Sequence, residues 1–174
     1  MHLKTFRHLL SVAVLSFVAL IFAFGQDARS QSAFGAWAIS CVAEGPRETQ
    51  CALFHRQVIE NSGAVLLEVQ LVGLETGRDP SLLITVPLGV NITDQLTLKI
   101  DETVNQKFGY STCGNRGCTV RILNSELIQR FSEGVELQVS YQLGLEDTRE
   151  VERSVSLFGV QEGIEKIKAA EPAQ

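Results

Sequence analysis

The stretch LTLKID, residues 96–101, has the clearest alternation of apolar and polar side chains in the sequence. In an extended strand, successive side chains point to opposite faces. Leu96, Leu98 and Ile100 would therefore share one face, and Thr97 and Lys99 the other. This period of two is typical of a strand that packs one face against a core. The stretch predicts a half-buried β-strand.

Segments of similar character lie on both sides of this strand. Together with residues 96–101, about nine short strands are predicted, the others at residues 35–41, 51–60, 64–74, 81–86, 108–113, 118–123, 135–143 and 151–158. Turn-forming residues separate many of them, such as Asn61-Ser62-Gly63 and the proline at position 87. The chain therefore reads as a succession of strands joined by short connections.

Two stretches have helical periodicity instead. Residues 125–133 place Leu127, Ile128 and Phe131 at helical spacing, with Ser125 as the predicted N-cap and Gly134 as the stop. Residues 161–170 form a second candidate helix. Many short strands and few helices indicate a sandwich or a barrel. We predict an all-β fold, an immunoglobulin-like antiparallel β-sandwich with one or two short helices.

Apolar positions in the predicted strands define the expected core. The faces that would meet between the two sheets carry Trp37, Ile39, Leu98, Ile100 and Val139. Trp37 alternates with Ile39 and Cys41, so we expect its indole in the core and not at a binding surface.

The N-terminus has the order of a secretory signal peptide. Lys4 and Arg7 precede an uncharged apolar run over residues 9–24, and Ala23-Phe24-Gly25 places small residues before the expected cut. An uncleaved membrane anchor is the alternative. We expect residues 1–25 as signal peptide, 26–34 as N-terminal linker, 35–168 as the domain and 169–174 as a flexible tail. The expected location is periplasmic, or secreted or on the cell surface.

Charge disfavours two classes of partner. Without residues 1–25, the chain has 13 basic and 20 acidic residues, and the basic ones are scattered singly. Nucleic acids and anionic membranes are bound through clustered Lys and Arg. We therefore expect neither a nucleic acid nor an anionic membrane surface as a partner. We also expect no transmembrane segment in the mature chain.

The four cysteines are Cys41, Cys51, Cys113 and Cys118. An even number of cysteines in an exported chain predicts disulfides. Four cysteines allow three connectivities, and the sequence alone leaves them open. The local pairs 41–51 and 113–118 are favoured because each closes a short segment that contains turn residues. A zinc site and a thiol-redox centre are the alternatives, although neither cysteine spacing is the usual one.

The segment CGNRGC, residues 113–118, is predicted to be a hairpin turn closed by a disulfide, with glycines that allow the backbone to reverse. Asn115 and Arg116 would lie at its tip and form a possible contact loop.

Candidate catalytic groups are few. His2 and His8 lie in the predicted signal peptide, so His55 is the one histidine of the mature chain, and a Gly-x-Ser-x-Gly motif is absent. His55 is therefore interpreted as a strand-face residue. We expect a protein that is not an enzyme, with no catalytic, cofactor-binding or metal-binding residues and no cofactor.

An ordered set of short motifs resembles the invasion-associated locus B (IalB) family. The set is Trp37-x-x-x-Cys41, Cys51, Pro87-Leu-Gly-Val90, Ile100-Asp101, Tyr110-x-x-Cys113, Gly117-Cys118 and Ser156-Leu-Phe-Gly159. The chain has Glu102, Val160 and Gly163 where the family tends to have Gly, Phe and Ala. The resemblance implies an exported bacterial envelope protein with a β-sandwich fold and no known catalytic residues. The family is named for a contribution to host-cell entry.

The functional hypothesis follows from export, disulfides and the absence of a recognisable catalytic set. We expect an envelope protein without enzymatic activity that acts by contact with a protein in the envelope or on a host surface, with host-cell invasion as the finer hypothesis. One alternative is a periplasmic hydrolase or thiol-redox enzyme. Another is a structural envelope component with no host role.

Overall fold

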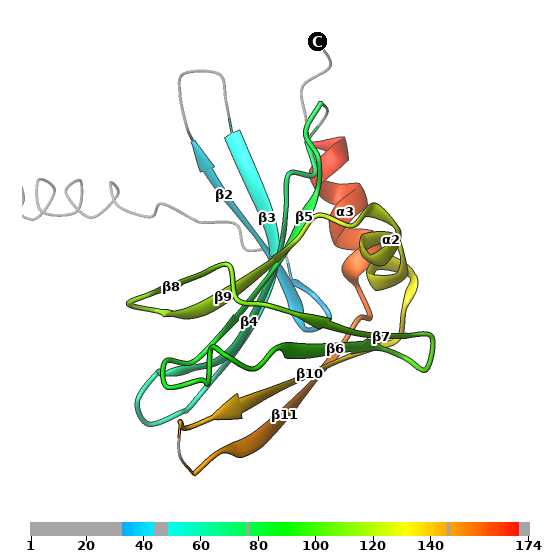
Figure 1. Cartoon of the computed structure of the whole chain (residues 1–174). Helices are drawn as coiled ribbons and strands as arrows, with labels where there is room; N and C mark the ends of the chain where they lie inside the picture. The colour runs from blue at the N-terminus through cyan, green and yellow to red at the C-terminus, as the bar shows by residue number, and fades with distance from the viewer. Residues whose placement is uncertain (1–32, 44–48, 76, 146, 171–174) are drawn as a thin grey trace, which may run out of the picture. The chain divides into compact units, whose positions relative to one another are not determined.

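The computed structural model describes residues 33–43, 49–75, 77–145 and 147–170. The predicted signal peptide, most of the predicted linker and residues 171–174 lie outside this part. The described residues form two antiparallel sheets and two short helices (Figure 1). This confirms the predicted all-β sandwich.

The larger sheet has seven strands and the smaller has four. In spatial order, the larger one contains β1 (Ala33–Phe34), β2 (Trp37–Ala43), β3 (Thr49–Val58), β4 (Val65–Val72), β5 (Ser81–Val86), β9 (Gly117–Ile122) and β8 (Thr112–Gly114). The smaller one contains β11 (Arg149–Ser156), β10 (Glu136–Leu143), β6 (Leu96–Ile100) and β7 (Val104–Phe108). The helices are α2 (Ser125–Glu133) and α3 (Val160–Ala169).

One face of the seven-stranded sheet carries the core. In Figure 1, the helices lie beside the upper part of this inner face and the four-stranded sheet beside its lower part. The inner face contributes side chains that are fully buried: Leu53, Leu67, Val69, Leu71, Leu82 and Ile84. Of the predicted core, Trp37, Leu98, Ile100 and Val139 are at most 1% exposed, whereas Ile39 is only partly buried. The alternation in the sequence therefore identified the buried faces.

Trp37 connects the seven-stranded sheet with α2 and with the end of β11. Its indole Nε1 donates to the Ser156 carbonyl oxygen at 2.8 Å, and its ring meets the Phe131 ring edge to face at 5.5 Å between centroids. The polar end of the indole thus has a partner although the side chain is buried, as buried tryptophans require. The expectation of a core tryptophan is confirmed.

Gly163 allows α3 to lie close to β3. A Cβ atom at this position would come to 2.5 Å from Leu53 Cδ1. A glycine in a helix interior costs stability of about 0.5–1 kcal/mol relative to alanine. The close approach to a fully buried leucine gives this departure from the family pattern a packing reason.

Asp101 closes the turn between β6 and β7 and also holds the start of β10. It has a positive φ of 49°, which aspartate tolerates better than most residues. Its carboxylate accepts hydrogen bonds from the backbone N–H of Val135 at 3.1 Å and of Glu136 at 2.8 Å. The Ile100-Asp101 pair therefore links two strands of the smaller sheet.

Two local predictions need correction. The N-cap of α2 is Asn124, not Ser125, because the Asn124 side chain accepts the hydrogen bond from the Leu127 N–H at 3.0 Å. The predicted strand over residues 108–113 is divided, since β7 ends at Phe108 in one sheet and β8 begins at Thr112 in the other. Local alternation cannot show that a chain changes sheets within such a segment.

Candidate functional site

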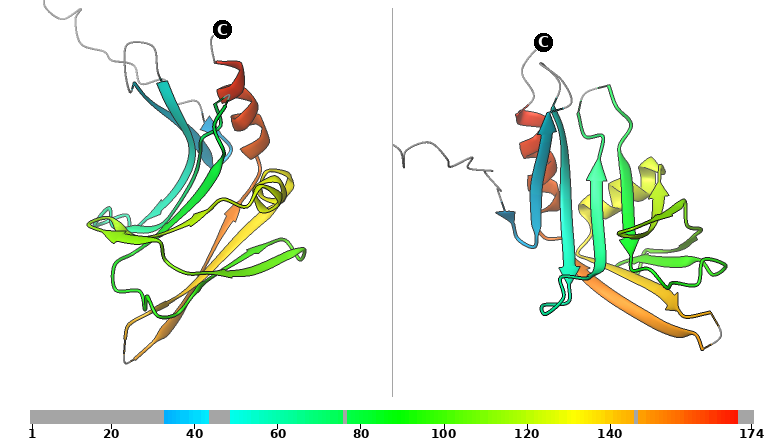
Figure 2. Two further views of the ribbon diagram at one scale, coloured as in Figure 1. Left: turned by 45° about the horizontal axis from the view of Figure 1, so that its top comes forward. Right: turned by 90° about the vertical axis from the view of Figure 1, so that its left-hand side faces the viewer.

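The outer face of the seven-stranded sheet is the candidate site. The right-hand view of Figure 2 looks onto this face, and no element of the described chain lies in front of β2 to β5. A groove of about 750 Å³ opens on it, lined by side chains from β2, β3, β4, β5 and β9 and from two connections between strands.

Small side chains form the floor of the groove. Ser40 pairs with Ala52, and Val72 pairs with Ser81. These pairs belong to one row across the sheet, because Leu53 pairs with Leu71 beside them. Such a row spans about 14 Å over four strands, at about 4.8 Å between strands.

Larger side chains occupy the next row and raise one side of the groove. Phe54 pairs with Gln70, Gln70 with Leu83, and Leu83 with Arg121. Phe54, Gln70 and Arg121 line the groove. The hollow is therefore a step between a row of small and a row of large residues, and its shape follows from strand register.

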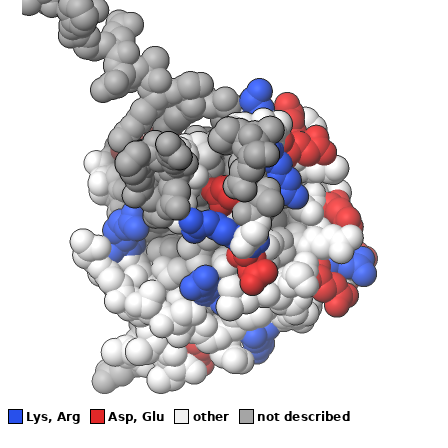
Figure 3. All heavy atoms as spheres, turned by 90° about the horizontal axis from the view of Figure 1, so that it is seen from above, with Lys and Arg blue, Asp and Glu red and all other residues white. Residues whose placement is uncertain are grey.

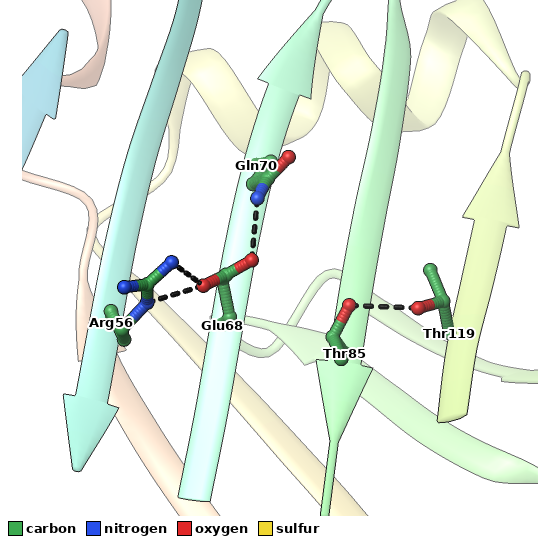
Figure 4. A network of polar contacts seen from close by, with 5 residues as sticks. All are labelled: Arg56, Glu68, Gln70, Thr85 and Thr119. Carbon is green, nitrogen blue, oxygen red and sulfur yellow. Dashed lines mark hydrogen bonds and ion pairs between the residues drawn. The ribbon is translucent and has the colours of Figure 1, made fainter. Parts of the chain in front are cut away.

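The third row carries a polar network (Figure 4). Glu68 is only 5% exposed, and its carboxylate accepts hydrogen bonds from Gln70 Nε2 at 2.5 Å and from the Arg56 guanidinium, with which it also forms an ion pair. The hydroxyls of Thr85 and Thr119 are hydrogen-bonded at 2.8 Å further along the row. A buried carboxylate needs such partners because an unpaired charge there is very costly.

Arginines surround the groove. Arg56, Arg78, Arg116 and Arg121 all contribute to its lining, together with Glu75 and Asp79. Figure 3 shows Lys and Arg side chains, with some Asp and Glu side chains between them, on the face seen from above. This concentration contrasts with the excess of acidic over basic residues in the whole chain.

Two of these arginines are held by neighbouring side chains. Arg56 donates to the Glu68 carboxylate, and Arg121 Nη2 donates to the Ser81 hydroxyl at 3.3 Å, where Ser81 is 1% exposed. Both arginines lie on strands of the sheet. A guanidinium that is already positioned loses less conformational entropy when it binds a ligand.

The predicted contact loop lies at the edge of this site. Gly114 pairs with Gly117 across the β8–β9 hairpin, which leaves Asn115 and Arg116 as its two-residue tip. Both tip residues are exposed. Arg116 lines the main groove, and both residues line an adjoining hollow of about 210 Å³ that Glu68 also borders.

The disulfide pairing is confirmed. Cys41 is bonded to Cys51 across β2 and β3, and Cys113 is bonded to Cys118 across β8 and β9. All four cysteines are therefore used in covalent bonds. This arrangement holds neither a free thiol for exchange nor the four thiolates of a zinc site.

The first disulfide is connected to the groove. The backbone N–H of Cys51 donates to Glu75 Oε1 at 2.6 Å, and both residues contribute to the lining. One carboxylate of the groove is thereby engaged by the protein itself.

His55 lies away from the groove. Its side chain lies on the same, inner side of β3 as that of Leu53. Nδ1 is hydrogen-bonded to the Ala36 carbonyl oxygen at 2.7 Å, and the ring centroid is 5.7 Å from that of Trp37. Nε2 is buried with no hydrogen-bond partner among the described atoms. His55 thus packs beside the core tryptophan, in agreement with its interpretation as a strand-face residue.

Two tyrosines outside the groove lining, Tyr110 and Tyr141, have raised pKa values. Burial, with the nearby Tyr141 and Asp94, raises the pKa of Tyr110 to about 12. Burial also raises the pKa of Tyr141, whose hydroxyl donates to the Leu66 carbonyl oxygen at 3.1 Å. Over the residues with assigned positions, no three His, Cys, Asp or Glu side chains gather closely enough to hold a metal ion.

Comparison with known proteins decides the family. Residues 37–168 match the family described as Invasion associated locus B (IalB) protein, which covers more than half of the chain. The chain belongs to the IalB family. The resemblance seen in the sequence motifs is confirmed.

Known relatives extend this result. The chain is 24% identical over 140 residues to an invasion protein B homolog of Brucella abortus strain 2308, covering 80% of this chain and 79% of the relative. A homolog from B. abortus biovar 1, strain 9-941, matches equally well. The crystal structure of invasion associated protein B from Bartonella henselae superposes with a TM-score of 0.66 at 20% identity, covering 79% of this chain and 93% of that one. This likeness supports the IalB fold.

The family is named for association with invasion and not for an enzymatic activity. Where helices are described, none has the length and apolar character needed to span a membrane.

The sequence predicts the hairpin tip at Asn115 and Arg116 but not most of the groove. Arg56, Arg78 and Arg121 were scattered single charges in the sequence. Alternation with apolar residues places Arg56 and Arg121 on the solvent-facing side of their strands, and this signal is local. Their convergence on one groove depends on strand pairing, for which no local signal exists.

Proposed function

We propose that this protein is exported to the bacterial envelope or beyond and acts without catalysis, by binding another protein through the outer face of its seven-stranded sheet. Asn115 and Arg116 would take part in the contact. The two disulfides support a location in an oxidising compartment, periplasmic or at the cell surface.

The groove on the outer face carries this proposal. It is open, it combines polar, charged and apolar side chains, and it lies on rigid strands with the disulfide-closed hairpin at its edge. Val42, an apolar residue of its lining, is 59% exposed. Protein interfaces commonly combine apolar contacts with arginine, whereas an enzyme site needs converging catalytic groups.

Site-specific photo-cross-linking in living cells tests the contact. A photoreactive amino acid is placed at Asn115, at Val42 or at Gln129, and adducts are identified by mass spectrometry. Asn115 and Val42 adjoin the groove, whereas Gln129 is an exposed amide on α2 and serves as the matched control. We expect the same partner protein from Asn115 and Val42, and no adduct from Gln129. Equal adducts from all three positions, or none from the first two, would contradict the proposal.

A contribution to host-cell invasion is the finer proposal and is supported by the family name alone. It is tested by deleting the gene in the bacterium that produces the protein and measuring entry into cultured host cells. Complementation with the wild-type gene should restore entry, and complementation with an Asn115→Ala, Arg116→Ala variant should not. If deletion leaves entry unchanged although the protein forms its cross-link in cells that produce it, the protein has an envelope role without a host role.

A further inference from the structure

We propose that the groove on the outer face binds an acidic, extended segment of a protein partner, with the arginines of the groove receiving its carboxylates. This inference deepens the proposed function and rests on it. Its first support is charge: four arginines and only two carboxylates line one groove in a chain whose overall balance is acidic. A basic groove on an acidic molecule favours an anionic ligand over a neutral one.

Carboxylates neutralise only part of the positive charge of the groove, since its lining has four arginines against Glu75 and Asp79. Glu68 is paired with Arg56, and Glu75 accepts the Cys51 N–H. Within the segments that the structure describes, Arg56–Glu68 is the one ion pair between side chains. Arg78, Arg116 and Arg121 therefore offer guanidinium donors to a ligand. Guanidinium groups bind carboxylates through two parallel hydrogen bonds, which gives both strength and orientation.

Apolar side chains in the same groove distinguish a peptide from other anions. Val42 is 59% exposed, and Val72 and Phe54 are partly buried parts of the lining. A peptide with alternating acidic and apolar side chains can satisfy the arginines and also cover these surfaces. A sulfated sugar or a phosphate group has no aliphatic side chains with which to cover the valines.

The dimensions of the floor favour an extended segment. Its four small residues lie in a row across four strands, about 14 Å long at the usual strand spacing. A segment of about four to five residues in extended conformation has this length. A helix, with a diameter of about 10 Å, would be held by the rim and would leave the small residues of the floor without contacts.

Direct binding to the disulfide-intact mature protein tests the inference. The probe is a short fluorescent peptide in which glutamate alternates with valine and serine, measured by fluorescence anisotropy. The comparison probes are the same peptide with glutamine for glutamate and a heparin-derived oligosaccharide of similar length. We expect binding of the glutamate peptide that weakens with added salt, and binding of the glutamine peptide that is at least about tenfold weaker.

The arginines are tested by charge-neutral substitution. R78Q/R116Q/R121Q should weaken binding of the glutamate peptide by about tenfold or more, since three carboxylate contacts are lost. The control is K107Q/R130Q/K168Q, which removes the same charge from exposed positions outside the groove lining and should change binding less than about twofold. R78Q/R116Q changes only residues of the connections, so it remains informative if Arg121→Gln disturbs the sheet.

Three outcomes would overturn the inference: equal loss in the control variant, equal binding of the glutamine peptide, or binding of the oligosaccharide without binding of the peptide. The cross-linking experiment distinguishes failure of this inference from failure of the proposed function. If R78Q/R116Q/R121Q still forms the Asn115 cross-link at the wild-type level, the partner contact stands and the role of the arginines is refuted. If the wild-type protein forms no cross-link, the proposed function itself is refuted.

Discussion

Gly117 and Gly114 flank the tip of the β8–β9 hairpin, at the edge of the groove, but their surroundings differ. Gly117 has a φ of 141°, and a Cβ atom added there would lie 2.1 Å from the Val86 carbonyl oxygen on β5. Gly114 has no positive φ, and no described atom would lie within 4 Å of its Cβ. We therefore predict that the same substitution destabilises the protein at Gly117 and has little effect at Gly114, three residues away.

Gly117→Ala should destabilise the protein through two effects. A non-glycine residue in this backbone region costs about 1–3 kcal/mol. Pressing a methyl group against the β5 backbone adds about 1–3 kcal/mol, because the carbonyl oxygen cannot rotate away as a flexible side chain could. Together the free energy of unfolding should fall by about 2–6 kcal/mol. Gly114→Ala should change it by less than about 1 kcal/mol in either direction.

Urea unfolding of the disulfide-intact mature protein, followed by tryptophan fluorescence, measures both variants. Amide hydrogen exchange in β5 and β9 provides a local readout, since the clash would separate these paired strands before the whole domain unfolds. Exchange should increase in Gly117→Ala and not in Gly114→Ala. Unfolding free energies of the two variants within about 0.5 kcal/mol of each other would refute the reasoning.

Three further predictions concern other parts of the fold. The pKa of Tyr110 is raised from 10.0 to about 12, so the folded state holds the phenol proton more tightly than the unfolded state does. The contribution of this proton to stability is complete below pH 10 and is lost as the pH rises toward 12. Tyr110→Phe should therefore flatten the fall of the urea midpoint over this range, and an unchanged slope would contradict the prediction. Replacing Cys113 and Cys118 together by serine should lower the free energy of unfolding by about 2 kcal/mol, as measured in urea, because a short loop is no longer closed in the unfolded chain; no change would count against this account of the bridge. Asp101→Ala should lower the melting temperature more than Asp101→Asn, because asparagine tolerates the positive φ and keeps a side-chain acceptor for the N–H groups that begin β10; equal shifts would show that neither property matters.

Much of the fold was predictable because its signals are local. Alternation over residues 96–101 and its neighbours identified the buried faces of most strands, and helical spacing located α2 and α3 to within a residue. The helix cap was missed by one position, since Asn124 and Ser125 are both good cap residues. The change of sheet between Phe108 and Thr112 was missed because both halves of the segment are extended.

Part of the candidate site was predictable for the same reason. The tip residues Asn115 and Arg116 lie between two cysteines and two glycines, so their placement follows from short-range geometry. Arg56 and Arg121 were predictable only as residues of polar strand faces. Whether two such faces meet depends on pairings between distant segments, such as β5 with β9.

The sequence by itself determined the strand-rich class, the family motifs, the residues that face the core and the disulfide-closed hairpin with Asn115 and Arg116 at its tip. Each of these depends on neighbours within a few positions, where periodicity and turn chemistry act. Only the tertiary structure decided that a row of small residues lies beside a row of large ones and that four arginines surround the resulting groove. Strand register and order produce this arrangement, and both are set by the packing of the opposite, buried face.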